Sequence, residues 1–153
     1  MTYKIIDEPA ASAYNNLAVQ PLWPLFAIML GGTWLSFPWF VVNGFAIGCP
    51  NRMKTLGLAV LGFVGTGLIL LATMYFAATY EWDQYAVQYA LLVLTTWKLG
   101  VAYWLYVIQA RTFSLYQYFG GVVRNGLLVV GAGWFLGNRL LVGLPTFIQI
   151  VLR

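Results

Sequence analysis

Lys98 and Arg139 each lie near the middle of a long apolar segment. The two segments cover residues 84–110 and 125–152 and contain no other charged side chain. A cation at the centre of a membrane helix costs about 2.5–3.5 kcal/mol on insertion scales, so such residues normally face protein, water or a bound ion. A buried pair of cations would attract an anion, a lipid phosphate or the carboxylate of a neighbouring helix.

Small and polar side chains accompany these two cations at helical spacing. Counted at about 100° per residue, Thr95 and Gln109 fall in the same sector as Lys98. The corresponding sector of the later segment contains Asn125, Ala132, Arg139, Gly143 and Thr146. We therefore expect both cations, with Thr95 and Gln109 beside them, to face a bundle interior and to bind an anion, a lipid head group or a partner's acid.

An alternative interpretation keeps both charges out of the apolar core. Long Lys and Arg stems can extend several ångströms toward an interface. Gly137-Asn138 precedes Arg139 and the breakers of residues 143–145 follow it, so the helix could end there and leave Arg139 at a surface. The sequence leaves open whether this segment is continuous or is broken at Gly137-Asn138.

The other reactive residue types are scarce. The chain has no histidine and one cysteine, Cys49, so metal and haem sites built on imidazole and an internal disulfide are excluded. The four acids are Asp7, Glu8, Glu81 and Asp83, and none lies within a long apolar run. General acid–base catalysis at membrane depth therefore lacks its usual groups. We expect a protein that is not an enzyme and that needs no cofactor or metal.

The composition indicates that water is not the main solvent of this chain. Of its 153 residues, 61% are hydrophobic, 18% are aromatic and only 8% are charged, whereas soluble domains carry about 25% charged residues. The formal net charge of +4 is explained by membrane topology and lipid head groups rather than by nucleic-acid binding. The sequence predicts an integral membrane protein, expected in a plasma membrane such as the bacterial inner membrane.

The uncharged runs have the length of membrane helices. A hydrocarbon core of ~30 Å requires roughly 20 apolar residues in helical conformation. The runs are continuous and do not alternate with polar residues as the strands of a barrel would. We predict an all-α, polytopic protein with a single domain over residues 1–153: a polar arm over 1–20 and four transmembrane helices over 24–47, 55–80, 84–110 and 125–152.

Basic residues near the predicted helix ends give an orientation. Arg52 and Lys54 lie between the first and second helices, and Arg111 and Arg124 lie between the third and fourth. The positive-inside rule places these loops in the cytoplasm, with both termini on the other side. The aromatic stretch over residues 112–121 is interpreted as an interfacial segment; the alternative is a helical extension of the third span.

Small residues at helical spacing predict close contacts between helices. Gly133 and Gly137 form a G-x-x-x-G pair, and Gly62 and Gly32 each begin a similar spacing of small residues. Such residues allow helix backbones to approach closely in a membrane, either within one chain or between chains. Pro38, near the middle of the first predicted span, is expected to kink it.

Two functions fit these features. The first is an accessory, assembly or structural subunit of a membrane complex, whose mid-membrane cations bind partner acids, lipid head groups or anions. The alternative is a homo-oligomeric pore or anion-permeable channel, with the cations setting a positive potential along its axis. The expected partners are membrane lipids together with further copies or other membrane subunits, and no nucleic acid.

Overall fold

The computed structural model describes residue 9 and residues 12–153, and its elements are all helical, as predicted. Part of the predicted polar arm, including Asp7 and Glu8, lies outside the described residues. A short 3-10 helix precedes six α-helices: η1 (Asn15–Leu17), α1 (Leu22–Leu30), α2 (Thr33–Ala46), α3 (Arg52–Tyr80), α4 (Gln84–Tyr118), α5 (Leu127–Leu140) and α6 (Thr146–Leu152). Among these helices, α3 and α4 are long and apolar enough to cross a membrane.

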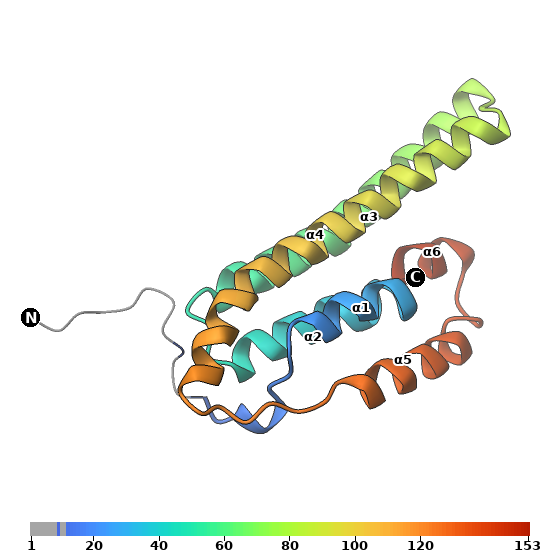
Figure 1. Cartoon of the computed structure of the whole chain (residues 1–153). Helices are drawn as coiled ribbons and strands as arrows, with labels where there is room; N and C mark the ends of the chain where they lie inside the picture. The colour runs from blue at the N-terminus through green and yellow to red at the C-terminus, as the bar shows by residue number, and fades with distance from the viewer. Residues whose placement is uncertain (1–8, 10–11) are drawn as a thin grey trace, which may run out of the picture.

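Helices α3 and α4 form an antiparallel hairpin that is the longest part of the molecule (Figure 1). They contain 29 and 35 residues, which correspond to about 43 and 52 Å. The chain reverses at Glu81, whose φ is a left-handed 48°, and Asp83 caps α4 by accepting a hydrogen bond from the Ala86 amide at 2.9 Å. Helices therefore occupy both predicted ranges, and the aromatic stretch as far as Tyr118 is an extension of α4 rather than a separate segment.

The prediction of one helix over residues 24–47 is wrong. The chain turns at Gly31 and Gly32, and α1 and α2 fold back on each other as a short hairpin (Figure 1). Gly32 has a φ of 90°, a backbone conformation that glycine adopts without steric cost. The Ser36 hydroxyl donates to the Pro24 carbonyl at 2.8 Å and joins the two arms. Pro38 lies within α2, so the glycine pair and not the proline redirects the chain.

The segment over residues 125–152 is also two helices rather than one. Helix α5 continues through Gly137-Asn138 and ends at Leu140. Residues 141–145 form the turn, and Pro145, which lacks an amide hydrogen, precedes α6. Helices α1, α2 and α5 have 9, 14 and 14 residues, so each is at most about 21 Å long and cannot cross a ~30 Å core alone.

The short helices pack beside one half of the α3–α4 hairpin and leave the other half projecting (Figure 1). The main core lies between α1, α2, α3 and α4 and consists of Ile28, Phe37, Phe40, Ala59, Val101, Ala102 and Leu105. Gly62 lies against this core, since a Cβ added there would come within 2.6 Å of the Phe37 ring. Gly133 and Gly137 of α5 similarly face Leu35 and Trp34 of α2. These glycines mark contacts within the chain.

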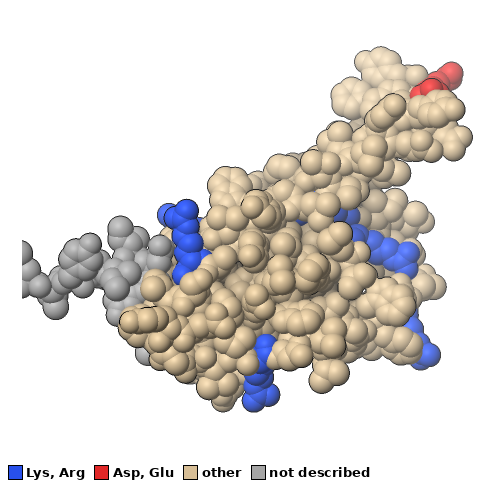
Figure 2. All heavy atoms as spheres, viewed as in Figure 1, with Lys and Arg blue, Asp and Glu red and all other residues tan. Residues whose placement is uncertain are grey.

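A second cluster closes the end of the molecule that holds the α2–α3 turn. It consists of Ala18, Ala46, Ile47, Cys49, Phe113 and Tyr116. This end of the molecule also carries Arg52, Lys54 and Arg124 and is called the basic end below. The Arg124 amide donates to the Ala18 carbonyl at 2.8 Å, so the N-terminal arm ends here. The N-terminal arm and the α2–α3 turn lie at the same end because the turn at Gly31 and Gly32 reverses the chain, so that α2 ends near the start of α1. The described acids lie at the opposite tip of the hairpin (Figure 2).

Candidate functional site

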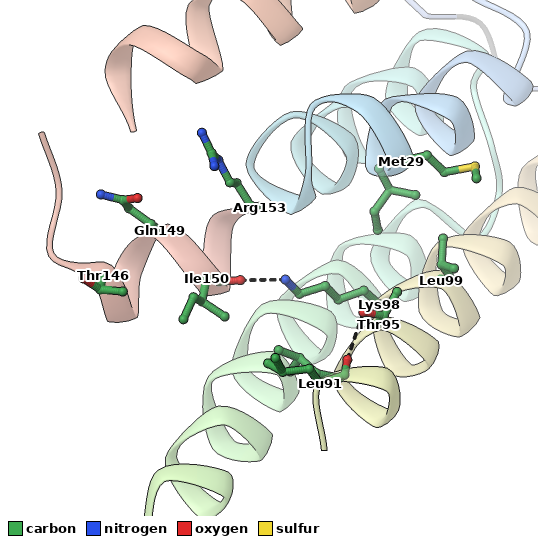
Figure 3. A pocket seen from close by; sticks show the side chains of 11 residues that line it. Met29, Leu91, Thr95, Lys98, Leu99, Thr146, Gln149, Ile150 and Arg153 are labelled. Atoms are coloured by element: carbon green, nitrogen blue, oxygen red, sulfur yellow. Dashed lines mark hydrogen bonds between the residues drawn. The ribbon is translucent and has the colours of Figure 1, made fainter. Parts of the chain in front are cut away.

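Lys98 lies three residues before the middle of α4 and is only 8% exposed. Its Nζ donates a hydrogen bond of 2.7 Å to the carbonyl of Ile150, in the last turn of α6 (Figure 3). The last carbonyls of a helix have no partner within that helix, and they form the negative end of its dipole. Lys98 therefore caps α6 from a neighbouring helix with a charge of the favourable sign.

Thr33, at the start of α2, caps the same helix end. Its hydroxyl lies 2.6 Å from the Val151 carbonyl and 3.0 Å from that of Leu152. Gly32 makes this approach possible, because a Cβ there would collide with the Leu152 carbonyl. Three successive carbonyls of α6 are thus bound by side chains of α4 and α2. The sequence pattern did not single out Thr33, since its contact depends on a turn that was not predicted.

A cavity of about 550 Å³ lies beside Lys98, between α1, α4 and α6 (Figure 3). Its polar lining comes from Thr95, Lys98, Thr146, Gln149 and Arg153, and its apolar lining from Ile28, Met29, Leu91, Leu94, Leu99 and Ile150. The predicted neighbour Thr95 is therefore present, with its hydroxyl bound to the Leu91 carbonyl of its own helix at 2.9 Å. The cavity is a mainly apolar recess with two cations in its wall.

No carboxylate side chain lines this cavity. The acids within the described part of the chain are Glu81 and Asp83, at the hairpin tip. Asp83 precedes Lys98 by 15 positions along the chain, which is ~22 Å at about 1.5 Å per residue. Neither Lys98 nor Arg153 has an ion pair with another residue that the structure describes.

Arg139 does not lie beside Lys98. It lies in the last turn of α5 with an exposed side chain, and its guanidinium carbon is 4.8 Å from the centre of the Phe135 ring. The break after α5 lets the chain return, and it brings Arg153 into the cavity wall instead. The prediction of a shared site for Lys98 and Arg139 assumed one straight helix. The alternative interpretation, in which the breakers around Arg139 leave it at a surface, agrees with this exposed position, although α5 continues through Gly137-Asn138.

Gln109 also lies outside the cavity, fully buried nearer the basic end. Its Nε2 donates to the Phe40 carbonyl at 2.5 Å, and its Oε1 accepts from Asn43 Nδ2 at 3.0 Å. Asn43 Oδ1 in turn accepts from the Val19 amide at 2.9 Å. This chain of hydrogen bonds connects α4, α2 and the N-terminal arm, so Gln109 joins helices within the bundle.

A second groove provides a contrast on another face of α4. Its volume is about 710 Å³, and its lining includes Leu58, Leu92, Trp97 and Trp104 but no charged residue. Its lining offers no charged group to an anion. The cavity beside Lys98 therefore stands out through its charges and not through its size.

Comparison with protein-family models, with curated proteins and with solved structures gave no match.

Proposed function

We propose that this protein is a non-enzymatic accessory or assembly subunit of a membrane complex, and that it holds an anionic group from outside its own chain at Lys98. The observation that carries the proposal is the recess with Lys98 and Arg153 in its wall and no carboxylate side chain in its lining. A cation such as Lys98, buried near the middle of an apolar helix, costs about 2.5–3.5 kcal/mol. A bound anion would offset part of that cost.

The chemistry of the recess favours binding over catalysis. Its polar lining offers ammonium, guanidinium, hydroxyl and amide groups, and it includes no histidine, cysteine or carboxylate. These groups donate hydrogen bonds to an anion, but they do not form the acid–base pair that a hydrolase requires. The pore alternative has less support, since Arg139 does not line the same cavity as Lys98.

We further propose a membrane placement in which α3 and α4 cross the bilayer, while α1–α2 and α5–α6 enter it from the basic side without crossing. The start of α3, with Arg52 and Lys54, and the connection that carries Arg124 then face the cytoplasm of a plasma membrane such as the bacterial inner membrane. This placement replaces the four predicted spans with two spans, one re-entrant hairpin formed by α1 and α2, and a segment formed by α5 and α6 that enters from the same side and reaches Lys98.

Cysteine labelling tests this placement. In a Cys49→Ser background, single cysteines replace Gln20, Lys54 or Glu81, all of which are exposed. We expect an impermeant maleimide to label the cysteines at positions 20 and 54 from one side and the cysteine at 81 from the other. Four continuous spans would instead place position 20 on the same side as position 81. Labelling of 20 together with 81 would therefore contradict the re-entrant placement.

The accessory function is tested by the composition of the native particle. The protein is extracted from its own membrane in polymer-bounded lipid discs, and the mass and subunit content of the discs are measured. We expect a second membrane protein in fixed stoichiometry. A homogeneous oligomer of this chain alone would contradict the proposal, and anion-selective conductance of that oligomer in liposomes would favour the pore.

A further inference from the structure

The recess beside Lys98 lies where the short helices stop and the α3–α4 hairpin continues (Figure 1). We propose that it receives a carboxylate carried by a membrane-spanning segment of another subunit. The inference rests on the proposed function, because it names the chemistry of the partner that the accessory subunit would hold.

The charges of the recess require an acidic occupant. An ammonium group has three donors, and Lys98 uses one of them on the Ile150 carbonyl at 2.7 Å. Arg153 has one hydrogen bond to a side chain, a contact of 3.3 Å to Asn138 Oδ1. Lys98 therefore keeps two donors for a further acceptor in the recess. The Arg153 guanidinium points toward α5 (Figure 3), so Arg153 adds positive charge to the wall of the recess rather than a donor beside Lys98. A carboxylate accepts several such bonds, and charged hydrogen bonds of this kind are stronger than neutral ones.

The depth of the recess favours a protein acid over a lipid head group. Lys98 is three residues before the middle of α4, a distance of about 4.5 Å along the helix. In the proposed placement this lies near the centre of the hydrocarbon core, whereas lipid phosphates lie at its edges, ~15 Å from the centre. A carboxylate on a transmembrane helix is held at such a depth by its own chain.

The shape of the molecule leaves room for such a helix. The tip of the α3–α4 hairpin beyond α6 has no other described helix beside it (Figure 1), although α6 itself contacts α3. The recess lies between α1, α4 and α6. Met29 and Thr95 at the recess are exposed, and Met29 keeps 68% of its surface accessible. Figure 2 shows Lys and Arg side chains on the side of the molecule below the projecting tip, and others at the opposite end. A partner helix packed there would bring its acid to Lys98 and Arg153.

A defined peptide tests the proposal even while the partner is unidentified. The full-length protein is placed in phosphatidylcholine liposomes with a fluorescent, membrane-spanning polyleucine peptide that has one glutamate at its centre. Association is measured by energy transfer, and peptides with central leucine or lysine are the matched controls. We expect the glutamate peptide to associate about tenfold more tightly than the leucine peptide, and the lysine peptide no more tightly than leucine.

Four variants locate the contact. Lys98→Met and Arg153→Met should reduce the preference for glutamate to near unity, while Lys54→Met, at the exposed basic end, should leave it unchanged. Because Lys98 also caps α6, Thr95→Trp provides a test that keeps both cations: the indole would fill the recess and remove the preference. An unchanged preference in both Arg153→Met and Thr95→Trp would overturn the proposal, as would equal binding of the three peptides by the wild type.

The lipid alternative and the proposed function have separate outcomes. If phosphatidylglycerol in the liposomes abolished the preference for glutamate, the recess would belong to lipid phosphate and the proposal would fail. A native particle with a stoichiometric partner, combined with equal peptide binding, would overturn this inference and leave the accessory function in place. If the protein purified only as its own oligomer but still preferred the glutamate peptide, the accessory function would be overturned and the carboxylate site would remain.

Discussion

The two halves of the α3–α4 hairpin have similar apolar sequences but different surroundings. The half near the basic end packs against α1 and α2, and it contains the buried residues Ala59, Gly62 and Leu105. The half near Glu81 contains the buried Leu70, and α6 contacts α3, but the tip beyond α6 projects alone (Figure 1). Met74 and other large apolar side chains of this half are more than half exposed. Hydrophobicity therefore does not decide which half binds protein. The half that binds protein is distinguished by small residues and by polar side chains whose hydrogen-bond partners lie on other segments.

The polar groups show this difference most directly. In the projecting half, the hydroxyls of Thr73 and Thr79 each donate to a carbonyl four residues earlier in the same helix, at 2.8 Å. That half is satisfied within its own backbone and can lie in lipid. In the packed half, Gln109 is fully buried and finds its partners on α2, where it bonds Asn43 and the Phe40 carbonyl. Lys98 lies at the boundary between the two halves.

Gly32→Ala should cause the largest loss of stability. The substitution introduces a Cβ at a positive φ and against the backbone of α6, so we expect a loss of about 2–4 kcal/mol in the free energy of unfolding. Unfolding is measured in mixed detergent micelles by near-ultraviolet circular dichroism. Gly143→Ala is the control, because a Cβ there meets open space. Equal stability of the two variants would mean that the α1–α2 turn does not pack on α6.

Gly62→Leu tests the packed half against the projecting half. A leucine at 62 would force the Phe37 ring aside, and overpacking of this kind costs about 1–3 kcal/mol. Gly67→Leu lies further along α3, without atoms within 4 Å of the added Cβ, and should change stability by less than about 0.5 kcal/mol. The same unfolding assay applies. Comparable losses at both positions would show that the projecting half is also covered by protein.

Gln109→Leu should have a smaller effect, of about 1 kcal/mol. It removes the partners of Asn43 and of the Phe40 carbonyl, and polar contacts between membrane helices are individually modest. Thr73→Val is the matched control in the projecting half and should be nearly neutral, since its hydroxyl serves only its own helix. The comparison fails if Thr73→Val destabilises the protein as much as Gln109→Leu does.

The sequence predicted the parts of the fold that depend on local pattern. Uninterrupted apolar runs identify α3 and α4, because the number of consecutive apolar residues needed to cross a membrane can be counted along the sequence. The turn at Gly31 and Gly32 was missed, since a glycine pair in an apolar run is compatible with both a helix and a break. The break before α6 was left open, because the sequence allowed either a continuous helix or one ended at Gly137-Asn138; α5 continues past that pair to Leu140.

The site was predicted in part. Helical spacing placed Thr95 beside Lys98, and both line the cavity. Arg139 and Gln109 were grouped with them. In the structure Arg139 lies at the end of α5 and Gln109 is buried between α4 and α2, and neither lines the cavity. Contacts such as those of Thr33 and Arg153 depend on how two broken helices fold back, which periodicity along one segment cannot show.

The capping of α6 by Lys98 and Thr33 has a consequence for biogenesis. The end of α6 has carbonyls whose partners come from helices made much earlier in synthesis. The α3–α4 hairpin and the core that it shares with α1 and α2 do not use these contacts. The capping bonds of Lys98 and Thr33 can therefore form only after the end of α6 has been synthesised, which makes them a late step in the assembly of this fold.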